Sequence, residues 1–239
     1  MKLRAIPLLL IAAMAFAIPA RATTAYELLF AFIGFDYQDP NTVLPPSLNH
    51  DDYLAVGEGY NVVGFVTQFG PLLLPYVDTG TYEYTNNING LTVATHNYTA
   101  GFFEATFNNG TGRASYYADS KTTGTPGTYG VNPPNATSPS TFTDGTLRLT
   151  GSVNNFVLDI NFNVSPANGS FSGDMTLDGG PDLVYVPVGD RAGWTIGATA
   201  GQVNPSVPTG YDNQVTGQCQ TLVTPTEHKT WGAIKALYR

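Results

Sequence analysis

The chain has 239 residues, of which 42% are hydrophobic and 12% charged, with 26 Gly, 17 Pro and one Cys. So little charge excludes a coiled coil and a charged disordered segment. Eighteen acidic against ten basic residues give a net charge of −8, which argues against nucleic acid or an anionic membrane as the main partner. A chain of this length with β-type patterning favours a single domain.

Residues 1–22 have the features of a secretory signal peptide. Lys2 and Arg4 precede an apolar stretch, and Ala20-Arg21-Ala22 has the small-x-small pattern of a cleavage site. The apolar stretch has about 14 residues, fewer than the roughly 20 that span a bilayer. We therefore predict a secreted or cell-surface protein with no transmembrane segment after cleavage. Its mature part would comprise a β domain at 23–223 and a short tail at 224–239.

The single cysteine, Cys219, excludes an internal disulfide, so the fold must be held by its core. Three interpretations of this residue stay open: a partly buried, small apolar side chain, a thiol that pairs between chains, or a catalytic nucleophile, although no local His accompanies it.

Short runs of Tyr, Phe, Val, Ile and Thr, bounded by Asn, Gly, Asp and Pro, recur along the chain and are typical of antiparallel strands. At Asn89-Gly90, Asn109-Gly110 and Asn154-Asn155 the apolar side chains switch between odd and even positions. We interpret each switch as a hairpin turn. The three hairpins would join 81–88 to 91–98, 102–108 to 111–118, and 147–153 to 156–162.

The hairpin at Asn109-Gly110 also predicts which side chains share a face. The inward set is Phe103, Ala105, Phe107, Gly112, Ala114 and Tyr116, and the solvent-side set is Glu104, Thr106, Arg113 and Ser115.

Eight or more such strands predict an all-β fold. We prefer an antiparallel β-sandwich, with an up-and-down β-barrel as the alternative. Two stretches, 36–59 and 119–141, are rich in proline and predict long loops.

Several acidic residues gather in the first of these loops. Asp36, Asp39, Asp51 and Asp52 are candidate ligands of a Ca²⁺ ion, because hard cations take several oxygens from such loops. Their spacing does not match an EF-hand. Ordinary turn chemistry of Asp is the alternative interpretation.

Aromatic residues provide a second candidate site. Tyr53, Tyr129, Trp194 and Tyr211 are candidate ligand-binding residues, because amphipathic rings suit the faces of sugars. The alternative is that they pack in the core or pair across strands.

The sequence gives little sign of catalysis. The strand-borne acids Glu83, Glu104 and Asp159 fall on predicted solvent faces of different strands, so we do not expect two of them to face each other across a cleft. The stretch 169–173 has Phe171, not a serine, at the central position of a nucleophile elbow. An enzyme is therefore not the favoured interpretation.

The composition changes after Pro225. Trp231, Ile234, Leu237 and Tyr238 would lie on one face of a short amphipathic C-terminal helix. The last nine residues also resemble a W-G-x-I-K-x-x-Y-R ending of exported bacterial proteins. This resemblance implies a shared export or surface-attachment tail.

Together these features predict a secreted, non-catalytic extracellular domain that binds a carbohydrate or a cell-surface component, or that serves as surface structure. Two alternatives remain: a barrel that carries a small apolar ligand, and a carbohydrate-active enzyme or its accessory carbohydrate-binding module.

Overall fold

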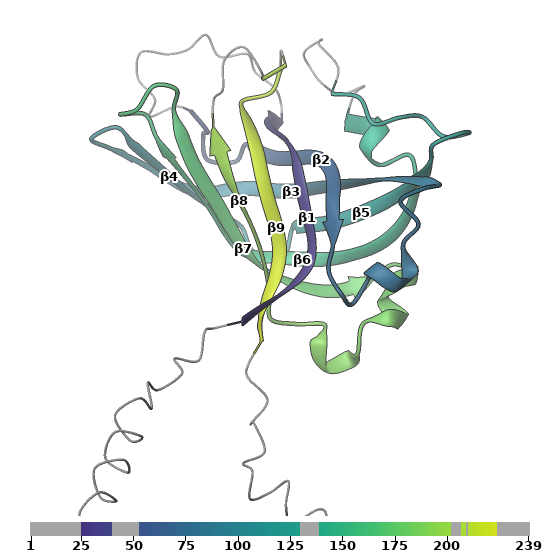
Figure 1. Cartoon of the computed structure of the whole chain (residues 1–239). Coiled ribbons are helices and arrows are strands. Elements are labelled where there is room, and N and C mark those ends of the chain that lie inside the picture. The colour runs from purple at the N-terminus through teal and green to yellow at the C-terminus, as the bar shows by residue number, and fades with distance from the viewer. Residues whose placement is uncertain (1–24, 40–52, 130–138, 202–206, 209, 224–239) are drawn as a thin grey trace, which may run out of the picture. The chain divides into compact units, whose positions relative to one another are not determined.

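The computed structural model describes residues 25–39, 53–129, 139–201, 207–208 and 210–223 (Figure 1). Four short 3-10 helices accompany the strands in these ranges: η2 (Leu74–Tyr76), η3 (Pro139–Phe142), η4 (Pro181–Tyr185) and η5 (Val188–Asp190). The nine strands are β1 (Ala25–Asp39), β2 (Gly59–Phe69), β3 (Tyr82–Thr99), β4 (Phe102–Phe107), β5 (Gly112–Ser120), β6 (Thr146–Asn161), β7 (Asn168–Gly179), β8 (Trp194–Gly201) and β9 (Asn213–Val223).

The strands form one closed antiparallel barrel. β1 pairs with β2 on one side and with β9 on the other, and β2 pairs in turn with β3, which closes the sheet (Figure 1). The preferred β-sandwich is therefore wrong, and the up-and-down barrel is confirmed. Local strand patterns are common to both architectures, whereas only the long-range pairing of β1 with β9 distinguishes them. The predicted C-terminal helix lies outside the described residues.

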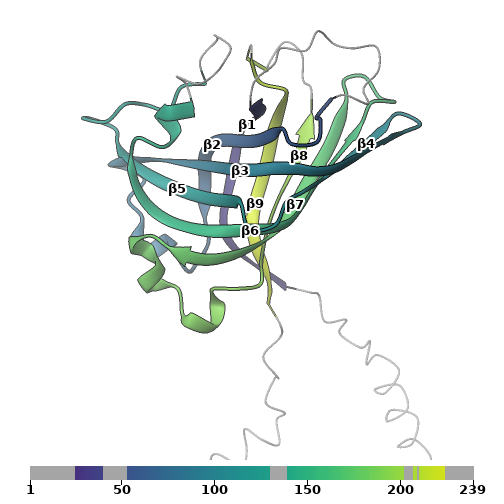
Figure 2. The same ribbon diagram turned by 180° about the vertical axis from the view of Figure 1, so that it is seen from behind.

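All three predicted hairpins are wrong. β3 and β6 each run continuously through the pair that was expected to turn, with register shifts at these points. β4 and β5 are both antiparallel to β3 and to β6, so they run in the same direction and together fill one position in the barrel (Figure 2). Extra residues in a bulge switch the inward parity just as a two-residue turn does, which is why the pattern did not separate the two.

The three positions at which turns were expected, 89–90, 109–110 and 154–155, lie next to one another in the barrel wall. The Asn155 backbone N–H donates to Asn109 Oδ1 (2.6 Å), and the Gly110 N–H donates to Asn154 Oδ1 (2.9 Å). Asn155 has a φ of 50° and donates from Nδ2 to Asp174 Oδ2 (2.8 Å). Gly90 has a φ of 70°, and a Cβ there would lie 2.4 Å from the Thr111 carbonyl oxygen, so only glycine fits.

Aromatic side chains fill the barrel interior. The ring of Tyr60 lies 5.7 Å from that of Phe107 and 6.0 Å from that of Phe156, and Phe69 lies 5.5 Å from Tyr116. The predicted inward face of 103–116 is confirmed, since its five side chains other than Gly112 are buried. Cys219 is also fully buried in this core, deeper than the partly buried position expected of it, and its thiol is not exposed for pairing between chains or for catalysis.

A second, smaller cluster lies on the outer face of β1 and β2. Tyr211 and Phe142 pack there with Val63, and the rings of Phe35 and Phe65 lie 4.6 Å and 5.5 Å from that of Tyr129. Tyr129 and Phe142, from the described parts of the loop between β5 and β6, thus cover this part of the wall.

Candidate functional site

Buried polar residues join three strands where the barrel closes. Asp36 of β1 accepts hydrogen bonds from the Tyr60 hydroxyl of β2 (2.6 Å) and from the Asn213 backbone N–H of β9 (2.6 Å). Asn213 Nδ2 donates to both Asp36 oxygens (3.1 and 3.0 Å) and to the Tyr53 hydroxyl (2.8 Å). We call these four residues, with the neighbouring Asp212, the seam cluster.

Burial changes the acid–base properties of the seam cluster. It raises the pKa of Asp36 from 3.8 to about 6, although the hydrogen bonds from Tyr60 and Asn213 oppose the change. Burial, together with the charges of Asp36 and Glu58, raises the pKa of Asp212 well above its usual value. The carboxyl groups of the seam cluster therefore hold protons more strongly than exposed acids do.

The seam cluster is suited to holding strands together rather than to binding a substrate. Asp36 is 0% exposed, and donors from β2 and β9 occupy both of its oxygens. Within the described ranges, no group of three or more His, Cys, Asp or Glu is arranged to hold a metal ion. Two oxygens of the cluster, Asp212 Oδ2 and Asn213 Oδ1, are buried without a donor among the described residues.

A shallow groove opens on the outer wall, where β3 ends, β4 begins, β6 ends and β7 begins. Its volume is about 290 Å³. The side chain of Phe102 is 57% exposed at this groove, beside the exposed carboxylates of Glu104 and Asp159. We call it the Phe102 groove. The remaining lining residues with polar side chains are Asn97, Thr99, Asn161 and Asn168.

Two acidic side chains lie next to each other on paired strands in the Phe102 groove. Glu104 of β4 and Asp159 of β6 are directly opposite in the register of the two strands. Both lie on the solvent faces of their strands, as expected, and they are side by side on one wall and not across a cleft. Like charges directly opposite each other destabilise a sheet. Among the described residues, neither carboxylate has an ion-pair partner.

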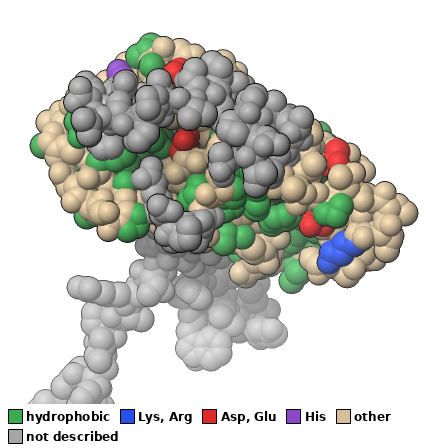
Figure 3. Space-filling view, turned by 90° about the horizontal axis from the view of Figure 1, so that it is seen from above, with side chains coloured by type: hydrophobic (Ala, Val, Ile, Leu, Met, Phe, Trp, Pro, Cys, Tyr) green, Lys and Arg blue, Asp and Glu red, His purple; other side chains and the backbone are tan. Residues whose placement is uncertain are grey.

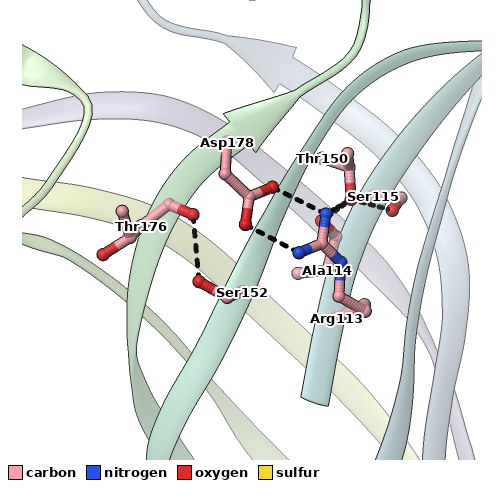
Figure 4. A network of polar contacts seen from close by, with 7 residues as sticks. All are labelled: Arg113, Ala114, Ser115, Thr150, Ser152, Thr176 and Asp178. Carbon is pink, nitrogen blue, oxygen red and sulfur yellow. Dashed lines mark hydrogen bonds and ion pairs between the residues drawn. The ribbon is translucent and has the colours of Figure 1, made fainter. Parts of the chain in front are cut away.

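The opposite arrangement occurs further along the same wall, on β5, β6 and β7. There Arg113 makes a two-pronged ion pair with Asp178 (2.7 and 2.6 Å) and also donates to Thr150 Oγ1 (3.1 Å) (Figure 4). The solvent-side position predicted for Arg113 is thus confirmed. Asp178 is thus neutralised by Arg113, whereas Glu104 and Asp159 have no such partner among the described residues. For this reason the Phe102 groove is the stronger candidate for a binding site.

The four predicted ligand-binding aromatics do not form one exposed platform. Trp194 is 1% exposed at the start of β8, whereas Tyr211 is buried just before β9, near the other end of the barrel. The rings of Tyr129 and Tyr211 do meet, 5.8 Å apart, in the outer aromatic cluster. Tyr53 is half-buried, with its ring edge-on to that of Phe103.

The predicted metal ligands are only partly covered by the structure. Asp36 lies within a strand rather than in a loop, because β1 extends to Asp39. The backbone of Asp39 ends that strand, and Asp51 and Asp52 lie outside the described residues. The structure therefore does not bring these four residues together as one site.

Sequence reasoning missed Phe102 and its acidic neighbours as a unit. The available signal was a large aromatic residue on the same strand face as Glu104 and Thr106, a face expected to meet solvent. Figure 3 shows the molecule from the groove end of the barrel, where acidic side chains appear at several points and basic ones near one edge.

Comparison of the chain with protein-family models, with curated proteins and with solved structures found no match. None of the helices in the described ranges combines the length and the apolar character that a membrane crossing requires.

Proposed function

We propose that this protein is a secreted or cell-surface, non-catalytic domain that binds carbohydrate in the Phe102 groove. The observation that carries the proposal is the exposed aromatic ring of Phe102 beside two carboxylates that have no basic partner among the described residues. A sugar offers a matching surface, since its C–H face packs on an aromatic ring and its hydroxyls donate to carboxylates.

The size and composition of the Phe102 groove support this ligand class. A groove of about 290 Å³ accommodates one or two sugar rings rather than a long, deeply enclosed chain. The side-chain amides of Asn97, Asn161 and Asn168 add both donors and acceptors around the acids. The site can therefore satisfy several hydroxyl groups at once.

The outer wall is preferred over the barrel interior as the binding surface. A carrier needs a lumen with room for its ligand, but here large rings such as Tyr60, Phe156 and Trp194 are fully buried inside the barrel. This packing is the reason that the apolar-ligand carrier is not the function we propose.

The proposal is tested by screening the purified mature chain on an array of bacterial and plant glycans, followed by calorimetric titration of the best ligand. We expect Phe102→Ala to weaken binding by about tenfold, because it removes the stacking surface. Glu104→Gln and Asp159→Asn should each weaken it as well. The matched controls are Tyr82→Ala, an exposed aromatic on the same sheet, and Asp144→Asn, an exposed acid.

The result that would overturn the proposal is the absence of binding on the array, or binding that the control variants reduce as much as Phe102→Ala does. A cationic ligand is the main competitor, since a ring and two carboxylates also suit a cation. Salt separates the two classes: binding of a neutral sugar should change little with added salt, whereas binding of a cation should weaken steeply.

A carbohydrate-active enzyme is the second candidate, favoured by the direct pairing of Glu104 with Asp159. Neighbouring residues on paired strands have Cβ atoms about 5 Å apart, close to the carboxylate spacing of retaining glycosidases. We rank it second because both acids are exposed on one wall and do not flank a cleft. A bell-shaped dependence of hydrolysis on pH, lost in Glu104→Gln, would establish it.

A further inference from the structure

Apolar side chains project into solvent at the end of the barrel opposite the Phe102 groove. Val184 of η4 and Val188 of η5 are 76% and 78% exposed, and Leu74, Tyr76 and Tyr185 are exposed beside them. The rings of Tyr76 and Tyr185 stack 3.6 Å apart and so join the loop after β2 to the loop after β7. We call these five residues the apolar tip.

The barrel holds the apolar tip in place from below. Asp182 of η4 is buried and accepts hydrogen bonds from the Tyr116 hydroxyl and from Arg148, at 2.6 Å for Arg148 Nη2. Arg191 donates to the carbonyl oxygens of Leu183 and Val186, at 3.3 and 3.2 Å. The exposed valines are therefore carried on an anchored loop. When a binding partner buries these valines, no conformational entropy is lost in ordering the loop, because the loop is already held in place. This is a feature of a preformed interaction surface.

The apolar tip lies at the end of the barrel where the first strand begins and the last strand ends. β1 begins beside the end of β2, and β9 ends beside the start of β8, so both ends of the domain lie at the apolar tip (Figure 1). The chain therefore continues into the predicted tail, residues 224–239, from the same end of the barrel as the apolar tip.

The chemistry of the tip favours an uncharged lipid surface. Arg148 and Arg191 are occupied by Asp182 and by backbone carbonyls, so neither forms a free basic patch for anionic headgroups. Tyrosine is favoured at the headgroup level of bilayers, and valine and leucine below it. Five side chains are also far fewer than the roughly 20 residues per partner in a stable protein interface. A dimer contact is thus the weaker explanation.

We propose that the apolar tip inserts into the interface of a phospholipid bilayer, which places the Phe102 groove on the side that faces away from the membrane. Binding should not require anionic lipid, because the chain has a net charge of −8.

The first test measures co-sedimentation of the mature chain with phosphatidylcholine vesicles, with and without phosphatidylglycerol. We expect Val184→Ser with Val188→Ser to weaken binding by at least about tenfold, because two valines that enter the bilayer on binding are replaced by polar side chains. The matched control is Val56→Ser with Val164→Ser, two exposed valines away from the tip. Both double variants keep the C-terminal tail, so their difference isolates the contribution of the tip.

A second measurement reports insertion directly. Val184→Cys, labelled with an environment-sensitive fluorophore, should show a blue-shifted and brighter emission on vesicles, whereas labelled Val56→Cys should not. Labelling is selective because the native thiol of Cys219 is fully buried.

Three results would overturn the proposal: no change at position 184, equal loss of binding in both double variants, or binding that requires phosphatidylglycerol. Self-association of the wild type that Val184→Ser with Val188→Ser abolishes would instead make the tip a contact between copies of the chain.

Discussion

Asp36 makes the stability of the barrel depend on pH in a direction opposite to that of a typical surface carboxylate. Its folded-state pKa is about 6, against 3.8 for the free side chain. Between these two values the folded chain keeps a proton that the unfolded chain has released. The free energy of unfolding therefore falls as the pH rises from about 4 to about 6, and the full loss is present above that range.

The size of this loss follows from the difference in pKa. A change from 3.8 to about 6 corresponds to about 3 kcal/mol, a large share of the stability of a domain of this size. Asp36→Asn removes the titration and keeps an oxygen that can accept from the Asn213 N–H. It also removes a charge that helps to raise the pKa of Asp212. We therefore expect the variant to lose less stability with rising pH than the wild type does, and the loss that remains to come from Asp212, whose pKa is raised mainly by burial.

The assay is urea unfolding of the wild type and Asp36→Asn at steps from about pH 4 to about pH 8. The wild type should lose stability across the lower half of this range, and the variant should overtake it at neutral pH. Asp144→Asn, an exposed acid, should keep the slope of the wild type. The reasoning is refuted if Asp36→Asn loses stability with rising pH as steeply as the wild type does.

Three further substitutions test other parts of the barrel by the same unfolding measurement. Asn155→Ala should cost about 2 kcal/mol, because it forces alanine into a left-handed conformation and removes the side-chain hydrogen bonds to Asp174 and from Asn109 Nδ2. Asn155→Gly should cost less, and equal losses would contradict a role of the positive φ. Glu104→Gln should stabilise the fold by about 0.5 kcal/mol while weakening ligand binding, because it relieves the repulsion with Asp159; a loss of stability would show that the pair does not repel. Arg148→Met should lower the free energy of unfolding by about 3 kcal/mol, because it leaves Asp182 buried without its ion pair. Adding Asp182→Asn should recover much of that loss. If it recovers none, the loss comes from the packing of the Arg148 side-chain stem.

The sequence was informative about which side chains face inward and uninformative about how the strands connect. Alternation identified Phe103, Ala105 and Tyr116 as buried, because burial has the same two-residue period in a hairpin and in a bulged strand. Asn-Gly is a strong turn signal. At positions 89–90, however, the glycine allows the continuous strand β3 to bulge where the backbone of Thr111 approaches it closely. Only the pairing of β3 with β5 reveals which of the two occurs.

The candidate site was harder to predict than the core, for a related reason. Glu104 and Asp159 are 55 positions apart in the sequence, and they meet only because β4 pairs with β6. Conversely, Tyr211 and Trp194 looked available for binding, but aromatic residues are equally suited to buried positions. Trp194 is buried in the barrel core and Tyr211 in the cluster on the outer face. Residue type alone does not decide between these two outcomes.

The seam between β1 and β9 also constrains how the protein is made. Asp36 and Asn213 are 177 positions apart, so their hydrogen bonds form only after almost the whole chain has left the ribosome. Until then β1 to β8 form at best an open sheet whose two edge strands lack partners, a state that invites pairing with other chains. The pairing of β9 with β1 is thus the late step that closes the barrel. Conditions that delay this step should increase aggregation.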